Sequence, residues 1–246
     1  MSSFTAHPSS QPTSSDDDAL DNLREQLRAE SLKKQLSAIH ELVSLGEGGI
    51  QILQATLLER QEQTPEILDG KIVQVLYATQ NPDVQTFLQT HWPQGRVPMP
   101  SERGMDYEPL QTLLIAQSFE EADRVGMQKL CELAGPDATR RKWLYFTEVE
   151  QFPVTDLRAL DTLWRVYSEG KFGFSRQREI WLSLGQNWDK LWTRIAWRND
   201  TTWTRYPNEF IWDLSAPDGH LPLSNQLRGV RVMSSLLGHP AWTLNA

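Results

Sequence analysis

Apolar residues recur every three or four positions along most of the chain, and this period predicts helices. The first apolar stripe begins at Leu20 and ends at Leu27. A second covers residues 32–43 and a third covers residues 50–58, with Gly46 between them. Apolar side chains at this spacing share one face of an α-helix, and a glycine just after the stripe is a stop signal. We therefore expect two antiparallel helices joined by a short turn, similar to one unit of an armadillo or HEAT array.

The same period continues into two shorter segments and then stops. Helices are expected over residues 65–77 and 82–90, and each begins with a proline, which the first turn of a helix tolerates. They complete an N-terminal helical bundle over residues 17–91. Residues 92–104 contain three prolines and two glycines and are predicted to be a linker. Residues 1–16 are rich in Ser, Pro and Thr, a composition typical of a disordered tail.

Helical periodicity returns in the C-terminal part, residues 105–246. Apolar stripes cover residues 107–114, 119–130 and 157–167. Residues 141–152 are less clear, because their aromatic side chains follow one another without a clean period, and a strand and a short helix both fit. No alternating pattern long enough for a sheet is found. The predicted fold class is all-α, with an N-terminal bundle of HEAT/armadillo-like helix pairs and a C-terminal helical domain.

A stretch near the C-terminus departs from this pattern. Four aromatic residues fall within ten positions, namely Trp203, Tyr206, Phe210 and Trp212, and prolines at 207, 217 and 222, within and after this run, restrict the backbone. The chain then enters a predicted helix that carries Arg228 and Arg231, whose spacing of three places both guanidinium groups on one face. A flat, apolar and anionic ligand would suit this surface. The alternative is that the rings are core residues and the arginines are solvated.

Charge, cysteine content and the length of the apolar runs limit the classes to which the protein can belong. The net charge is −8, and residues 1–102 alone hold 7 basic and 14 acidic side chains, so we do not expect nucleic-acid binding through a general basic face. A local basic patch in the second part of the chain stays open. Nine of the ten tryptophans follow residue 102, so the two parts of the chain differ in character. One cysteine, Cys131, allows neither an internal disulfide nor a cysteine zinc site. The apolar runs are too short for a transmembrane segment, and the first residues resemble neither a signal nor a transit peptide, so we expect a cytoplasmic protein.

Catalytic signatures are missing from the sequence. The five histidines are scattered without metal-ligand spacing, and GFSRQ at 173–177 lacks the second glycine of a nucleophile elbow. His220 lies near the aromatic stretch, where a loop hydrogen bond is the favoured role and a ligand contact the alternative. Cys131 falls on an apolar helix stripe and is expected in the core. We therefore expect no enzyme and no protein metal site.

Four longer motifs resemble one known family. They are MDYEPLQTLL, KLCELAGPDATRRKWLYFTEVEQFP, GKFGFSRQREIW and WDLSAPDGHLPLSNQLRGVRV. Residues 105–242 are in this way similar to the genomes-uncoupled (fourth member) family of tetrapyrrole-binding proteins, which stimulate magnesium chelatase in chlorophyll biosynthesis. The acidic helical bundle before them is similar to that of the family's cyanobacterial members, so the resemblance indicates a two-domain, cyanobacterial-type form.

The resemblance implies a binding site for protoporphyrin IX and Mg-protoporphyrin IX on a concave apolar face, bounded by a long loop before the last helix. By position in the family motifs, Asn225, Arg228 and Arg231 match polar porphyrin contacts, and Phe146 matches an apolar wall. Tyr206 stands where the family pattern WTRWP has a second tryptophan. Trp203 and Phe210 complete the predicted site.

The resemblance also implies a partner, magnesium chelatase, through its large porphyrin-binding subunit. We expect a monomer that requires no cofactor, binds no nucleic acid and has no transmembrane segment, with peripheral association with photosynthetic membranes as an option. A helical adaptor whose aromatic and arginine surface binds a protein is the alternative. An enzyme acting on a tetrapyrrole is a third interpretation. The sequence leaves open whether porphyrin is delivered, retained or shielded from light.

Overall fold

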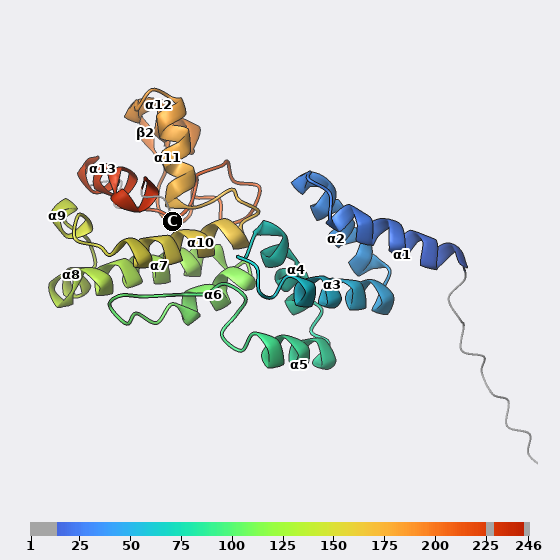
Figure 1. The fold of residues 1–246 in the computed structure, drawn as a ribbon. Helices are drawn as coiled ribbons and strands as arrows, with labels where there is room; N and C mark the ends of the chain where they lie inside the picture. Colours follow the sequence, from blue (N-terminus) through green and yellow to red (C-terminus); the bar gives the residue numbers. More distant parts are fainter. Residues whose placement is uncertain (1–13, 225–228, 244–246) are drawn as a thin grey trace, which may run out of the picture. The chain divides into compact units, whose positions relative to one another are not determined.

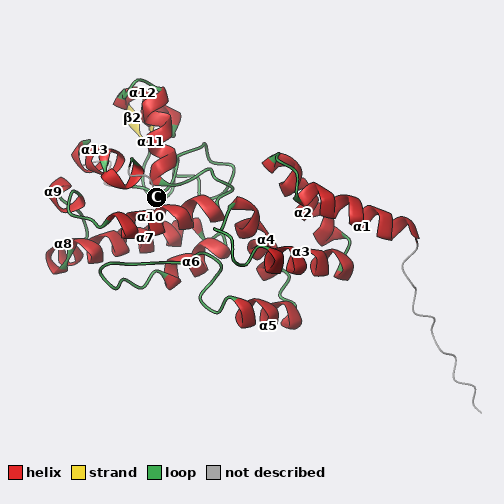
Figure 2. Ribbon diagram, viewed as in Figure 1, coloured by secondary structure: helices red, strands yellow, loops and turns green. Residues whose placement is uncertain are grey.

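The computed structural model describes residues 14–224 and 229–243, and in these ranges the fold is helical, as predicted (Figure 2). Its strands there are two residues each, β1 (Arg198–Asn199) and β2 (Thr202–Trp203), and they pair antiparallel. The chain forms two compact units, residues 1–63 and 64–246, which are described separately (Figure 1). No helix within the described ranges combines the length and apolar character needed to cross a membrane.

The first unit is built from three helices, α1 (Ser14–Leu27), α2 (Leu32–Ser44) and α3 (Glu47–Glu59). Each contacts the other two, and their apolar stripes meet in a core that includes the fully buried Ile39 and Leu53. Gly46, between α2 and α3, has φ of 72°, a left-handed value that glycine adopts without strain. The predicted pair of helices with a glycine turn is confirmed. The predicted tail lies outside the described residues up to residue 13, and α1 includes its last three residues.

The second unit contains the remaining elements. In chain order they are α4 (Ile67–Ala78), α5 (Pro82–His91), α6 (Glu108–Ile115), α7 (Phe119–Ala134), α8 (Pro136–Arg141), α9 (Phe146–Val149), α10 (Val154–Tyr167), α11 (Phe174–Ser183), α12 (Trp188–Arg194), the two strands, α13 (Arg231–Gly238) and the 3-10 helix η2 (Pro240–Trp242). Figure 1 shows α8, α9 and α13 at one end of the unit, and α9 and α13 pack on each other.

Helix α10 is the centre of this unit, because it packs against α4, α6 and α11. Its apolar stripe, predicted from the sequence, is buried, and Trp164 in it is 1% exposed. The Trp164 ring lies within 6.4 Å of the Phe119 and Phe172 rings, measured between centroids. Burial of three large rings in one place accounts for much of the stability of the unit. It also fixes the first turn of α7, which begins at Phe119.

Two buried side chains of the second unit, Gln111 and Asp156, form hydrogen bonds with residues 92–104. The Gln111 amide accepts a hydrogen bond from the Val97 N–H (3.0 Å) and donates to the carbonyls of Gln94 and Val97 (2.9 and 3.1 Å). Asp156, also buried, accepts hydrogen bonds from the Glu102 N–H (3.0 Å) and from the Tyr107 hydroxyl (2.8 Å). The domain boundaries that the sequence suggests, with a linker over these residues, stay a prediction.

Residues 141–152, for which the sequence allows a strand or a helix, contain the short helix α9. The N–H of Tyr145 donates to the Glu148 carboxylate (2.8 Å), which is one half of a capping box at the start of this helix. Val149 is buried beneath it, whereas Tyr145 is 48% exposed. Trp143 and Tyr145 contact each other with ring centroids 4.5 Å apart, so part of this aromatic run forms a local cluster just before α9.

Candidate functional site

A cavity of about 1160 Å³ opens between α7, the end of α8 and the loop that contains β2. Its walls come from three parts of the chain that are far apart in sequence. They are Asp123, Arg124, Val125, Met127, Gln128, Cys131, Thr139 and Lys142 from α7 and α8, Trp203, Thr204, Arg205 and Tyr206 from the loop, and Leu223 and Ser224. Drug-sized ligands occupy pockets of roughly 300 to 1,000 Å³, so this cavity has room for a large flat molecule.

The cavity combines apolar walls with exposed cations. Trp203 and Tyr206 offer rings, and Met127 offers a flexible thioether that adapts to irregular shapes. Lys142 and Arg205 are both exposed, so their charges lie where solvent reaches the opening. An apolar ligand with anionic groups at its edge matches this arrangement, because the apolar body is buried and the anions reach the cations.

Asp123 is the unusual member of the lining. Its side chain is 5% exposed, and its Oδ1 accepts a hydrogen bond from the Leu223 N–H at 2.6 Å. No cation forms an ion pair with it among the described residues, and burial raises its pKa from 3.8 to about 7. Buried carboxylates usually have a cationic partner, because an unpaired buried charge costs several kcal/mol. This carboxylate lines the cavity, and the described part of the chain supplies no such partner.

His220 holds the loop in place from behind. Its Nδ1 donates to the Ile195 carbonyl (2.6 Å), and its Nε2 accepts from the Ile211 N–H (3.1 Å), which fixes one neutral tautomer. The ring is buried, and burial lowers its pKa, so it stays neutral. The expected role as a loop hydrogen-bonding residue is confirmed. Gln177 on α11 adds two anchors, since its amide donates to the carbonyls of Gly219 (3.0 Å) and Pro222 (2.8 Å).

A row of tryptophan rings supports the β2 side of the cavity. Trp192 and Trp197 stack with centroids 5.5 Å apart and an interplanar angle of 8°. Trp203 contacts Trp192 at 5.8 Å, so the cavity wall rests on this stack. The Trp197 indole N–H donates to the His220 carbonyl at 2.7 Å. The aromatic loop is therefore anchored to the helical core by stacked rings and one indole hydrogen bond.

The structure separates the loop residues predicted for the site. Trp203 and Tyr206 line the cavity, and Tyr206 is 53% exposed. Phe210 does not line it, because its ring is 6% exposed and lies against His220 (5.3 Å) and Trp212 (5.8 Å). Phe210 thus packs inside the loop and supports the cavity wall indirectly.

Phe146 and Arg231 come together at a different place. The Arg231 guanidinium lies 5.5 Å from the centre of the Phe146 ring, where α9 packs on α13, and neither residue lines the cavity. The helix expected to carry both Arg228 and Arg231 begins only at Arg231, and that expectation was wrong. Gly229 has φ of 79°, a left-handed value that interrupts a helix before that point. Asn225 and Arg228 lie outside the described residues.

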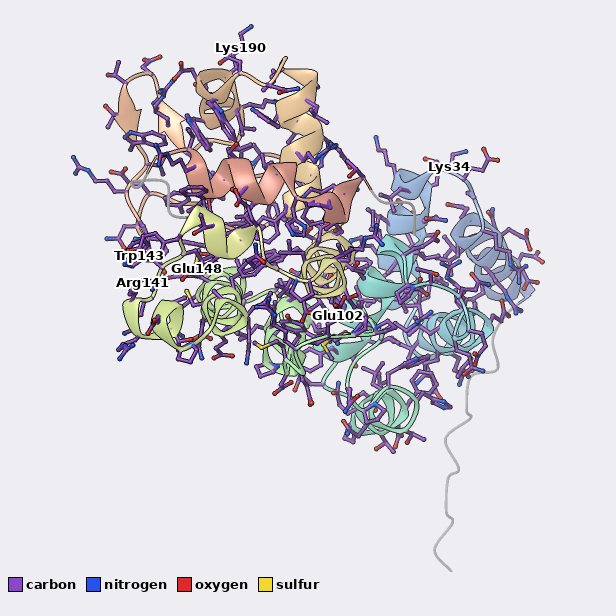
Figure 3. The ribbon with its side chains drawn as sticks, turned by 60° about the vertical axis from the view of Figure 1, so that its left-hand side comes forward. Lys34, Glu102, Arg141, Trp143, Glu148 and Lys190 are labelled. Atoms are coloured by element: carbon purple, nitrogen blue, oxygen red, sulfur yellow. The ribbon has the colours of Figure 1, made fainter. Side chains whose placement is uncertain are left out.

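The segment before Phe146 is held by an arginine. Figure 3 shows Arg141, Trp143 and Glu148 close together at this end of the unit. The Arg141 Nη2 group donates to both oxygens of Glu148 (2.7 and 2.8 Å), and the guanidinium lies 4.9 and 4.5 Å from the ring centres of Trp143 and Tyr145. Charge-assisted hydrogen bonds combined with ring contacts fix the position of this guanidinium. Lys142 at the cavity and Phe146 on α9 are positioned on either side of this cluster.

Several lining residues were missed at the sequence level, among them Asp123, Lys142, Arg205 and Leu223. Asp123 follows two glutamates in FEEADR and reads as one more solvated acid of a helix start. The only hint in the sequence is its spacing of four from Phe119, which puts both on the buried face. Within the described residues no group of three or more His, Cys, Asp or Glu side chains could hold a metal ion. Cys131 is buried, as expected, and burial raises its pKa to about 11.

Comparisons with known proteins agree with this arrangement. The family model described as GUN4-like matches residues 100–240, and one described as an ARM-like repeat domain, GUN4-N terminal, matches residues 12–93. A Ycf53-like protein of Synechocystis sp. is 49% identical over 92% of this chain and 97% of its own length. A chloroplastic protein of Arabidopsis thaliana named as tetrapyrrole-binding is 36% identical over 55% of each chain.

Solved structures extend the likeness to the fold. The structure of GUN4 from Chlamydomonas reinhardtii is similar at a TM-score of 0.56 and 39% identity, over 60% of this chain and 95% of that one. The ligand-free structure of Arabidopsis thaliana GUN4 is similar at a TM-score of 0.53 and 35% identity, over 56% of this chain and 99% of that one. Both family models and a relative that matches along nearly its whole length show that this chain belongs to the GUN4 family, in its two-domain form with an ARM-like N-terminal domain.

Proposed function

We propose that the protein binds protoporphyrin IX and Mg-protoporphyrin IX noncovalently and stimulates magnesium chelatase in chlorophyll biosynthesis. The observation that carries the proposal is the cavity, which joins aromatic walls to exposed cations in a member of a family with a tetrapyrrole-binding relative. A porphyrin has the matching chemistry, because its macrocycle is flat and apolar and its two propionates are anionic. Binding and release, without a covalent step, is the activity these residues support.

The expected affinity follows from the area that the cavity can cover. Covering about 300 Å² of macrocycle at about 25 cal/mol per Å² contributes about 7 kcal/mol. The cost of association removes several of these kilocalories, and charge-assisted bonds to exposed cations return about 1 kcal/mol each. A dissociation constant between about 0.1 and 10 μM is therefore expected. Such an affinity permits transfer of the ligand to another protein.

The contributions of Arg205, which lines the cavity, and of Arg231, which the sequence predicts for the site, can be tested by reversing their charge. Arg205→Glu and Arg231→Glu should each lower the affinity for a dicarboxylate porphyrin about fivefold to tenfold, because an attraction for a propionate becomes a repulsion. Arg205 belongs to the cavity, whereas Arg231 lies over Phe146. The measurement is quenching of tryptophan fluorescence as deuteroporphyrin, a water-soluble analogue, is added to the purified protein.

Arg194→Glu is the matched control, because Arg194 is exposed on α12 and lines no part of the cavity. Its affinity should stay within about twofold of the wild-type value, which bounds the effect of net charge alone. An effect of Arg205→Glu without one of Arg231→Glu would confine the ligand to the cavity. If the affinities of both variants equal that of the control, the proposed site is wrong. If porphyrin does not quench the tryptophan fluorescence of the wild-type protein, the protein-binding adaptor is favoured instead.

Stimulation of the chelatase is tested separately. A reconstituted magnesium chelatase should insert magnesium faster when the wild-type protein is added, and less so with the variant of lowest porphyrin affinity. We place the contact on the large porphyrin-binding subunit because a carrier must meet the subunit that receives its ligand. If the wild-type protein binds porphyrin but does not change the rate of magnesium insertion, stimulation of the chelatase is rejected. The proposal of porphyrin binding is then unaffected.

A further inference from the structure

Asp123 is the one carboxylate among the described residues that line the cavity. Its Oδ1 accepts the hydrogen bond from the Leu223 N–H (2.6 Å), and its second oxygen has no hydrogen-bond partner in the described part of the chain. The side chain is 5% exposed, so the charged form depends on the little water that reaches it through the cavity. A ligand that fills the cavity removes this water, and loss of water favours the neutral form of a carboxyl group.

The charges around Asp123 do not replace the missing water. On α7, Glu120 is a further anion, and the exposed Arg124 is bound to a neighbouring glutamate at 2.9 Å. Lys142 at the end of α8 and Arg205 in the loop are exposed cations, and neither forms an ion pair with Asp123 in the ranges that the structure describes. The remaining segment of the lining carries no charge. Burial therefore dominates and raises the pKa of Asp123 from 3.8 to about 7.

A bound porphyrin would act on Asp123 in two ways, and both favour the neutral form. Its apolar macrocycle takes the place of water, and its two propionates add negative charge. The exposed cations Lys142 and Arg205 attract the propionates and so stay unavailable to Asp123. The neutral carboxyl keeps its place in the fold, because the hydrogen bond from the Leu223 N–H requires only an oxygen that accepts. The ionised form would be left buried beside an anionic ligand, which is costly.

We infer that the cavity binds a porphyrin together with one proton, which Asp123 takes up from solvent, so that binding is tight when this side chain is neutral and weak when it is ionised. The inference rests on the proposed function. No bond of the ligand changes, and the proton moves between solvent and the second oxygen of Asp123. Because binding takes up a proton, the affinity falls as pH rises. The wall of the cavity thus contains a device that holds the ligand at lower pH and releases it at higher pH.

The test is the affinity for deuteroporphyrin at pH 7, 8 and 9, measured by quenching of tryptophan fluorescence. For the wild-type protein the affinity should fall about tenfold from pH 7 to pH 9. For Asp123→Asn it should stay within about twofold, since the amide carries no charge and keeps the hydrogen bond from Leu223. The other weak acids of the lining stay neutral in this range, because burial raises the pKa of Cys131 to about 11 and that of Tyr206 above its ordinary value. Propionates are ionised throughout it.

Glu120→Gln is the matched variant, because it removes a charge from an exposed position of α7 and should keep the wild-type fall in affinity. A second readout is calorimetry at pH 8 in buffers that differ in ionisation enthalpy, which counts the protons taken up with each porphyrin. We expect between about half a proton and one proton for the wild-type protein and for Glu120→Gln, and close to none for Asp123→Asn.

Two results would overturn the inference and leave porphyrin binding intact. One is a wild-type affinity that is equal at pH 7 and pH 9, without proton uptake. The other is a fall in affinity that Asp123→Asn shows to the same extent, which would assign the proton to another group. If Asp123→Asn does not fold, the proton uptake of the wild-type protein decides by itself. If the wild-type protein binds no porphyrin even at pH 7, the proposed function itself has failed.

Discussion

Asp123→Asn is expected to raise the free energy of unfolding at about pH 8, a gain in stability from the loss of a charge. The folded-state pKa of Asp123 is raised from 3.8 to about 7 by burial. One unit of pKa corresponds to about 1.4 kcal/mol, so the ionised carboxylate destabilises the fold by roughly 4 kcal/mol. Asparagine has nearly the same shape and keeps the hydrogen bond from Leu223, and it avoids that cost. We expect a gain of about 2 to 4 kcal/mol in chemical denaturation.

The sign of the pH dependence follows from proton binding. Between pH 4 and pH 7 the folded protein holds a proton on Asp123 that the unfolded chain has released, so wild-type stability falls as pH rises through this window. Below it both states are protonated, and above it the penalty is complete. The asparagine variant lacks this contribution, so the difference between the two proteins should be small near pH 4 and full near pH 8.

Glu120→Gln is the control, because it removes a charge one turn away on the exposed side of α7. Its stability should stay within about 0.5 kcal/mol of wild type at both pH values. Equal stability of the asparagine variant and wild type at pH 8 would show that the Asp123 carboxylate is satisfied in the folded protein.

A destabilising buried carboxylate such as Asp123 is expected to be retained during evolution mainly at a binding site. A protein selected only for stability would replace a buried, unpaired carboxylate, since many substitutions at functional sites increase stability.

The helices were predictable because their burial is periodic. The stripes that begin at Leu20 and continue through residues 157–167 depend only on neighbours three and four positions apart, and in the structure their residues are buried or half-buried. Gly46 marked a turn correctly, since a left-handed φ is a local property of the backbone. Local signals of this kind need no knowledge of the tertiary fold.

The candidate site was predictable only in part, because its walls join segments distant in sequence. Leu223 and Asp123 are exactly one hundred residues apart, and only the folded loop shows that the carboxylate is buried. Trp203 and Tyr206 belong to a conspicuous aromatic run, but the run itself does not reveal that Phe210 turns inward. The motif comparison named Phe146 and Arg231, and their mutual contact requires α9 to meet α13, which no local pattern indicates.

Trp197→Ala should give the largest loss of stability among the tryptophan substitutions in the loop region. Trp197 is fully buried, stacks on Trp192 with centroids 5.5 Å apart, and donates its indole N–H to the His220 carbonyl at 2.7 Å. Replacing a buried tryptophan by alanine costs about 3 to 5 kcal/mol, through lost burial and the cavity that remains. Here a buried carbonyl also loses its donor, which adds about 1 kcal/mol or more. Denaturant unfolding monitored by circular dichroism measures the change.

The same substitution should also weaken porphyrin binding by about tenfold or more, since a shift of about 1 Å in the walls of a site is enough to lose that much. Trp197 touches no ligand in this account, and it acts through the stack that supports Trp203 and through the loop that continues from His220 to Leu223. Trp197→Phe keeps a ring in the stack and loses the N–H, so its stability and its porphyrin affinity should both fall between those of wild type and Trp197→Ala.

Trp143→Ala is the control, because the Trp143 ring is half-buried beside Arg141. It should lower the free energy of unfolding by about 1 kcal/mol and leave porphyrin binding nearly unchanged. Full binding by a destabilised Trp197→Ala protein would mean that the ligand does not depend on the β2 side of the cavity, and would direct attention to the Phe146 and Arg231 contact instead.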